Sequence, residues 1–264
     1  MNPSYALEGA WTILKKDFAS YCRSWTGVLV SFSFLLISGI FFTVFVLGYS
    51  QLSFEAVRQP YEGIDDLNLT RFVVGSFLLN LGVFFLFVAP LLSMRSFSEE
   101  RRMGTLELLY TYPLSDIEIV LGKYLALAAE LTLLYLPTLT YLVVLKFLGT
   151  DLEGGIFVAG SLGFIFLGAM CLAIGLFFSS LTENQMLAAS LTFMVLLALW
   201  ILEWLTGFLP PGWGNPIRLF SPFVHYRDFS LGILDLSDLT YFLSAIAFFL
   251  FLTLRVVETR NWKG

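Results

Sequence analysis

The chain has 264 residues, of which 58% are hydrophobic and 13% are charged, and its net charge is −5. A typical soluble protein has about 25% charged residues, so the composition excludes a soluble globular protein and indicates an integral membrane protein. The acidic balance, with 20 Asp and Glu against 15 Lys and Arg, gives no reason to expect a nucleic-acid partner.

The N-terminal segment predicts an amphipathic helix over residues 3–25. Its apolar residues recur at three- and four-residue intervals, as on one face of a helix: Leu7, Trp11, Leu14, Phe18, Tyr21 and Trp25. Such a helix lies flat on the surface of the lipid bilayer. No small-residue cleavage pattern follows the next apolar run, so we expect that run to be a retained span and not a signal peptide.

Six apolar runs follow, and each is long enough to cross a bilayer, which takes about 20 residues. They cover residues 26–48, 72–93, 124–147, 156–178, 186–207 and 239–254. Strands of a membrane barrel would appear as alternating segments of about 10 residues. We therefore predict an all-α polytopic membrane protein, a single domain over 1–264 with a six-helix bundle over 26–254 and a tail over 255–264.

Positive charge indicates the orientation, because Lys and Arg are retained on the cytoplasmic side. One set of connecting segments holds Lys15, Lys16, Arg23, Arg95, Arg101, Arg102, Lys123, Arg255, Arg260 and Lys263. The opposite set holds Arg58, Arg71, Lys146, Arg218 and Arg227. The first set contains the two termini, so we predict that both termini are cytoplasmic.

The segment EERRMGTLELLYTYPLSD, residues 99–116, is charged although it separates two very apolar runs. Thr105 after Gly104 is a suitable N-cap for a helix of about two turns that ends before Pro113. Leu106, Leu109 and Tyr110 would share one face of that helix,. This apolar face indicates either a docking element for another protein or an amphipathic hairpin on the lipid headgroups.

Capping signals and small residues organise the next spans. Ser115 to Glu118 has the form of a capping box that starts the third span, and Thr182 to Gln185 has the same form before the fifth,. In the fourth span Ser161, Gly168 and Gly175 recur every seven residues and predict close helix packing, either within the subunit or between two copies,.

Two acidic residues fall in or near the spans, where ionisable groups are functional candidates. Glu130 lies in the third span, and we expect it to pair with a neighbouring helix or to extend toward the cytoplasmic surface. Glu203 lies near the end of the fifth span, where we expect interfacial exposure.

The segment from Leu219 to Leu236 predicts a short helical outer element, either re-entrant or lying on the membrane surface, and not a flexible loop. It is too polar to span, yet Phe223, Tyr226 and Phe229 are three residues apart and so share one helical side,. Further signals mark its ends: Pro222 suits the first turn, Gly232 suits a helix terminus, and Ser237 suits the N-cap of the last span.

The chain lacks the motifs of enzymes that the membrane setting allows. A phosphate-binding loop needs G-x-x-x-x-G-K-[ST], but Ile117 stands where the first glycine belongs before Gly122 and Lys123. Glu99 and Glu100 are followed by Gly104 at the position where a prenyl-peptide protease needs Arg. His225 is the only histidine, so we expect no metal site. An intramembrane enzyme remains a remote alternative.

Four stretches resemble one family. Residues 96–126, SFSEERRMGTLELLYTYPLSDIEIVLGKYLA, resemble the signature loop of ABC-2 type transporter permeases, especially those of gliding motility and of nitrous-oxide-reductase maturation. Residues 179–193, SSLTENQMLAASLTF, and 221–244, SPFVHYRDFSLGILDLSDLTYFLS, resemble later parts of the same family, and ILKKDFASYCRS, residues 13–24, resembles its interfacial helix.

The resemblance implies that this chain is the permease subunit of a complex in the bacterial inner membrane. A coupling helix would contact a separate ATPase subunit through Arg101, Arg102, Met103, Gly104, Thr105, Leu106, Glu107, Leu108, Leu109, Tyr112 and Pro113. ATP and magnesium would be bound by that partner, so this chain needs no cofactor. A second permease copy or a related permease would complete the complex.

The resemblance also implies a role for the outer helix. Phe223, His225, Tyr226 and Phe229 would form an outer gate or a docking surface for a protein with a periplasmic domain. Either export or mechanical work on such a partner without solute transport would use the same coupling helix.

Overall fold

The computed structural model describes residues 3–58, 69–105, 114–147, 154–205, 208 and 219–261. Across these ranges every regular element is a helix, which confirms the predicted all-α fold. Six segments are long and apolar enough to cross a membrane: Trp25–Glu55, Thr70–Arg102, Asp116–Phe147, Gly154–Leu181, Gln185–Leu205 and Leu236–Thr259. Each contains or overlaps one of the six predicted runs.

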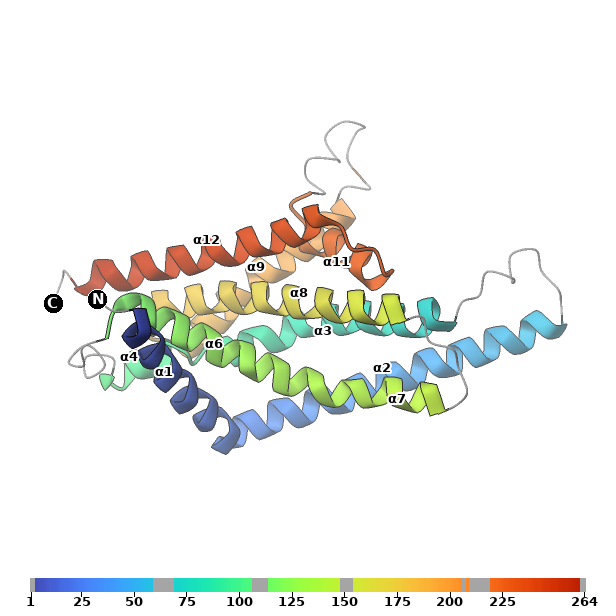
Figure 1. The fold of residues 1–264 in the computed structure, drawn as a ribbon, viewed down its shortest axis with the longest axis horizontal. Helices are drawn as coiled ribbons and strands as arrows, with labels where there is room; N and C mark the ends of the chain where they lie inside the picture. The colour runs from blue at the N-terminus through green and yellow to red at the C-terminus, as the bar shows by residue number, and fades with distance from the viewer. Residues whose placement is uncertain are drawn as a thin grey trace.

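The N-terminal helix α1 (Pro3–Arg23) is separate from α2 (Trp25–Arg58) and lies across one end of the bundle (Figure 1). Ser24 forms the corner between them, because its hydroxyl oxygen accepts a hydrogen bond from the amide of Gly27 at 2.9 Å and so caps α2,. The predicted helix over 3–25 is thus confirmed, with its last turn two residues shorter. It packs along α6.

Three segments form the buried core. They are α3 (Ser76–Ser93) with the π-helical turn Thr70–Gly75 before it, α6 (Asp116–Tyr135) with its continuation α7 (Leu139–Phe147), and α8 (Gly154–Leu181). Their most apolar windows are 56–61% buried, against 11–17% for α2, α9 (Gln185–Leu205) and α12 (Leu236–Asn261). The three outer helices therefore present most of their apolar surface to the surroundings of the chain.

The junction of α6 and α7 is a short 3-10 turn, Leu136–Thr138. Pro137 lies inside it and lacks the backbone N–H that a continuous α-helix would need. The third span is therefore bent at this point and is not one straight helix.

The small residues of α8 serve close packing inside the chain. Ser161 accepts a hydrogen bond from the hydroxyl of Tyr135 in α6 at 2.6 Å. A Cβ at Gly168 would lie 2.8 Å from the side chain of Leu131, and one at Gly175 would overlap Ser93 of α3. Of the two readings open from the sequence, packing within the subunit is the one that these contacts support.

We expect Gly175→Ala to destabilise the bundle by about 1–3 kcal/mol, because the added methyl group would force α8 and α3 apart. The measurement is the free energy of unfolding of the purified protein in detergent. The matched control is Gly155→Ala in the first turn of α8, where a Cβ meets no atom within 4 Å. Equal stability of the two variants would contradict this packing.

One predicted cap is confirmed and two are wrong by two residues. Ser115 and Glu118 form the predicted capping box at the start of α6. Before α9, the carboxamide of Asn184 accepts from the amides of Met186 and Leu187, at 2.9 and 3.3 Å, so Asn184 and not Thr182 is the N-cap. Before α12, Asp235 accepts from the amide of Ser237 at 3.0 Å and takes the predicted place of Ser237.

Candidate functional site

The chain leaves the core at one end through a tight turn and a short helix. Residues 94–97 form the turn, and α4 (Ser98–Arg102) follows it. Ser179 of α8 fixes this turn: its hydroxyl oxygen accepts from the amides of Phe97 and Ser98, at 3.0 and 3.2 Å, and donates to the Met94 carbonyl at 3.1 Å. Helices α1 and α4 and the last turns of α12 lie at this same end of the bundle, called the α4 end below (Figure 1).

Helix α4 was not predicted from the sequence, and Gly104 has a role beyond the expected one. Gly104 has a φ of +68°, which favours glycine,, and its amide donates to the Arg101 carbonyl at 3.1 Å. It therefore terminates α4, in addition to preceding Thr105. The side chains of Arg102 and Met103 are exposed at this point.

Most of the predicted coupling helix lies outside the described residues. This holds for Leu106, Glu107, Leu108, Leu109, Tyr112 and Pro113, whereas Arg101, Arg102, Met103, Gly104 and Thr105 are described. The structure therefore shows the segment that precedes residues 106–113 and residue 114, where the chain continues toward α6. The turn 94–97 and helix α4 are together called the mount below.

A buried ionic cluster holds this mount together. Lys123 of α6 has a side chain that is 1% exposed, and its Nζ lies 2.7 Å from Glu100 Oε2 of α4 and 3.2 Å from Asp17 Oδ2 of α1. The same Nζ donates to the Ser96 carbonyl at 2.6 Å and lies 5.2 Å from the ring centre of Phe97. One cation therefore connects α1, α4 and the turn before α4 to α6.

A second cation completes the cluster on its exposed side. Lys16 of α1 donates to Glu100 Oε1 at 2.7 Å, so both oxygens of Glu100 face an ammonium group. Burial alone would lower the pKa of Lys16, but the hydrogen bond to Glu100 and the charges of Glu100 and Asp17 outweigh it and raise that pKa. Lys16 is therefore charged at neutral pH, and the Glu100 carboxylate is shared between two helices.

Sequence reasoning assigned Lys123 and Lys16 only to the positive-inside count and gave Asp17 and Glu100 no role. A signal was present, because Lys123 lies two turns into an apolar helix, where an isolated charge is costly. Glu99 and Glu100 followed by Arg101 and Arg102 also match the charge preference at the two ends of a short helix. The contacts of Glu100 and Lys123 with α1 join residues that are far apart in the sequence, and no local pattern predicts them.

Glu130 lies on the same helix as Lys123, two turns further from the α4 end. Its side chain is buried, with the residue 5% exposed. Within the described part of the chain, its Oε2 has no hydrogen-bond partner, so the partner expected on a neighbouring helix is not found there. Burial raises the pKa of nearby Tyr21 to about 12; its hydrogen bond to Ser31 opposes the rise and the charge of Glu130 adds to it.

The predicted outer helix exists as α11 (Pro222–Ser230), away from the α4 end (Figure 1). Pro222 is in its first turn, and Gly232, with a φ of +86°, follows its end, as predicted. Phe223, Tyr226 and Phe229 are all buried, and the helix packs against α8, α9 and α3. It is therefore a fixed part of the bundle and not a loop over its surface.

Polar contacts attach α11 to three neighbours. The Tyr226 hydroxyl donates to the Leu78 carbonyl of α3. His225 Nδ1 lies 2.6 Å from Asp238 Oδ1 of α12, and its Nε2 lies 3.0 Å from the Leu219 carbonyl. Arg227 lies 3.0 Å from Glu203 Oε1 of α9. Glu203 has a side chain only 16% exposed, so the expected simple interfacial exposure is wrong, and its carboxylate is an anchor for α11.

We expect Tyr226→Phe to lower stability by about 0.5–1.5 kcal/mol, because it removes one buried hydrogen bond without changing the packing. Amide exchange in nanodiscs should then become faster across α11, from Phe223 to Ser230, while α6 keeps its protection. In the unsubstituted protein the amides of α11 should exchange far more slowly than those of an unstructured peptide. Equal exchange of α11 in both proteins would show that the hydrogen bond does not hold it.

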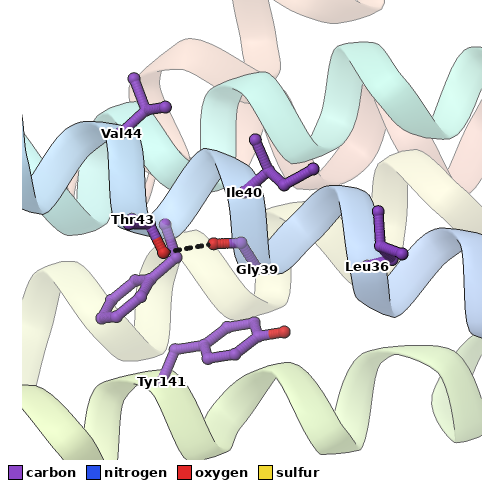
Figure 2. A pocket seen from close by; sticks show the side chains of 7 residues that line it. Leu36, Gly39, Ile40, Thr43, Val44 and Tyr141 are labelled. Atoms are coloured by element: carbon purple, nitrogen blue, oxygen red, sulfur yellow. Dashed lines mark hydrogen bonds between the residues drawn. The ribbon is translucent and has the colours of Figure 1, made fainter.

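Figure 2 shows a shallow pocket of about 440 Å³ between α2 and α7. It is lined by Leu36, Gly39, Ile40, Phe42, Thr43, Val44 and Tyr141. Its polar atoms are already used, because Thr43 donates to the Gly39 carbonyl at 2.8 Å and Tyr141 donates to the Leu35 carbonyl at 3.1 Å. With no Asp, Glu, Lys, Arg or His among its lining residues, it offers mainly apolar contact, so the α4 end is the better candidate site.

The family model of the ABC-2 family transporter proteins matches residues 11–259, which includes all six apolar spans and helix α4. No curated protein matches the sequence closely enough to count as a relative. Within the described residues, no group of three or more His, Cys, Asp and Glu side chains is placed to hold a metal ion.

Proposed function

Because the chain belongs to the ABC-2 family of transporter proteins, we propose that it is the permease subunit that couples ATP hydrolysis by a separate ATPase subunit to export or to mechanical work across the membrane. The subunit is itself non-catalytic, and ATP and magnesium are bound by the partner. It works as a pair, with a second copy or a related permease, and the resemblance of residues 96–126 supports a kinship with the permeases of gliding motility and nitrous-oxide-reductase maturation.

The observation that carries this proposal is the ionic cluster of Lys123, Glu100, Asp17 and Lys16. A force applied to residues 101–113 by a moving ATPase must reach the spans on both sides of that segment. Ser179 fixes the turn after α3, and the cluster fixes α4 to α6 and α1. Held by these contacts, α4 would move together with α6 and α1. An amphipathic hairpin resting on lipid headgroups would not need such contacts.

The proposal places the protein in the inner membrane of a bacterial cell, with α4 and both termini on the cytoplasmic side. The distribution of Lys and Arg supports this orientation. It places α11 on the opposite side, where Phe223, His225, Tyr226 and Phe229 hold a closed outer gate or a surface for a periplasmic partner. The burial of all four residues favours the gate, because buried side chains are not available to a docking protein.

Purification of the tagged chain from its native membrane tests the proposal. We expect a polypeptide with a phosphate-binding loop to co-purify and the eluate to hydrolyse ATP. Replacing the lysine of the partner's phosphate-binding loop should abolish that hydrolysis, because this lysine contacts the transferred phosphate. Hydrolysis that persists with the chain alone, made in a host without the partner, would contradict a non-catalytic permease.

A further inference from the structure

A cavity of about 550 Å³ lies at the α4 end, between α1, α2, the turn after α3, and α6. One wall is the ionic cluster, and the opposite limit is Glu130. Seven residues of helix separate Glu130 from Lys123, which places the two side chains about 10 Å apart along the axis of α6. Between them the lining is mostly apolar: Leu29, Val30, Leu91, Leu92, Ala126 and Leu127. The volume is within the usual range of small-molecule sites.

The charges that line the cavity are nearly all committed to one another. Lys16 and Lys123 pair with Glu100, and Lys123 also pairs with Asp17. Arg95 donates to the hydroxyl of Thr26 at 2.6 Å and lies 3.9 Å from Glu99. Arg95 Nε and Glu100 Oε2 also lack a hydrogen bond, but each has an opposite charge within 4 Å. Glu130 differs, because among the described residues its buried Oε2 has no hydrogen-bond partner and its carboxyl group has no ion-pair partner.

We propose that this cavity binds an amphiphilic organic cation, with its ammonium group on the Glu130 carboxylate and its apolar body along the leucines of α2 and α3. A buried carboxylate without a partner is costly, and an ammonium group supplies both the charge and the hydrogen-bond donor that it lacks. A hard metal ion needs several oxygen ligands, which Glu130 alone does not offer. An anionic lipid headgroup would be repelled by the same carboxylate.

This proposal concerns binding by this chain and does not depend on the ATPase subunit. The probe is dansylcadaverine, which joins a fluorescent aromatic body to one primary ammonium group. We expect saturable binding to the protein in phosphatidylcholine nanodiscs, beyond the signal of empty nanodiscs. Glu130→Gln should weaken binding about tenfold or more, the loss of at least 1.4 kcal/mol. Glu55→Gln, which alters an exposed carboxylate near the end of α2, should leave it unchanged.

The chemistry of the ligand is tested with a matched probe. N-acetyl dansylcadaverine keeps the aromatic body and loses the charge, so it should bind the unsubstituted protein about tenfold or more weakly. Equal affinity of the two probes, equal affinity of the Glu130→Gln protein, or no saturable binding at all would each overturn the proposal.

A measurement on the unsubstituted protein covers the case in which Glu130→Gln does not fold. The apolar reagent dicyclohexylcarbodiimide labels buried carboxyl groups, and mass spectrometry locates the adduct. We expect labelling at Glu130 to slow at least severalfold when dansylcadaverine saturates the site. Labelling at an unchanged rate would show that the ammonium group does not reach this carboxyl group.

Discussion

The double substitution Leu106→Asp and Leu109→Asp is expected to abolish co-purification of the ATPase subunit and the ATP hydrolysis that accompanies it. Both residues lie outside the described part of the chain, and the sequence places them on one apolar face. Two leucine side chains buried in a partner's groove contribute about 3–6 kcal/mol. Losing them weakens binding by about a hundredfold or more, and the two added carboxylates would also have to be desolvated.

The control is the pair Ile233→Asp and Leu234→Asp beyond α11, where both side chains are exposed. It adds the same two charges away from the α4 end of the bundle and should leave the complex intact. Membrane insertion, measured as the amount of protein in the membrane fraction, should be equal for both variants. If Leu106→Asp with Leu109→Asp still co-purifies the ATPase in full, the coupling-helix assignment is wrong.

Lys123→Met is expected to lower the free energy of unfolding by about 3–5 kcal/mol, the effect of breaking a buried ion pair by removing one partner. Asp17 and Glu100 would face each other's negative charge with only Lys16 left between them. Helices α1 and α4 should then separate from α6, and ATP-coupled activity should fall more than the amount of folded protein does. Thermal unfolding in detergent and the ATPase rate of the purified complex measure the two effects.

Two further variants separate the effect of the lost charge from the effect of altered packing. Adding Asp17→Asn and Glu100→Gln to Lys123→Met removes the uncompensated charges and should recover most of the lost stability, because a neutral buried cluster avoids desolvation. Lys15→Met, at an exposed position of α1 next to Trp11, should change stability little. Equal losses for Lys15→Met and Lys123→Met would show that the cluster does not hold the α4 end.

The six spans were predictable because bilayer thickness sets a length of apolar chain that composition alone reveals. The helix α11 was predictable for a related reason: Phe223, Tyr226 and Phe229 repeat with the helical period between Pro222 and Gly232. In both cases the signal is local. Each signal is contained in one segment of about 20 residues or fewer.

Two N-caps were predicted two residues from their true positions, because several side chains near each helix start are able to cap it. Asn184 and Asp235 place an oxygen two residues before the amide that they accept from. Thr182 and Ser237 were equally suitable by residue type. The exact start of a helix depends on how the preceding chain enters it, which a local motif does not record.

The ionic cluster was not predicted, because its members are far apart in sequence. Asp17 and Lys123 are 106 residues apart, and Lys16 and Glu100 are 84 apart. Each residue alone has an ordinary explanation as a charge near the membrane surface. Only the packing of α1 along α6 brings them together, and that packing depends on the whole bundle.

Site-specific photocrosslinking in intact cells tests the central claim most directly. A benzophenone amino acid is placed at Met103, which is exposed at the α4 end, or at Leu234, which is exposed near α11. A docking site on the α4 end predicts a crosslinked product with the ATPase subunit from Met103 and none from Leu234. A product from Leu234 alone would contradict both the proposed orientation and the proposed coupling site.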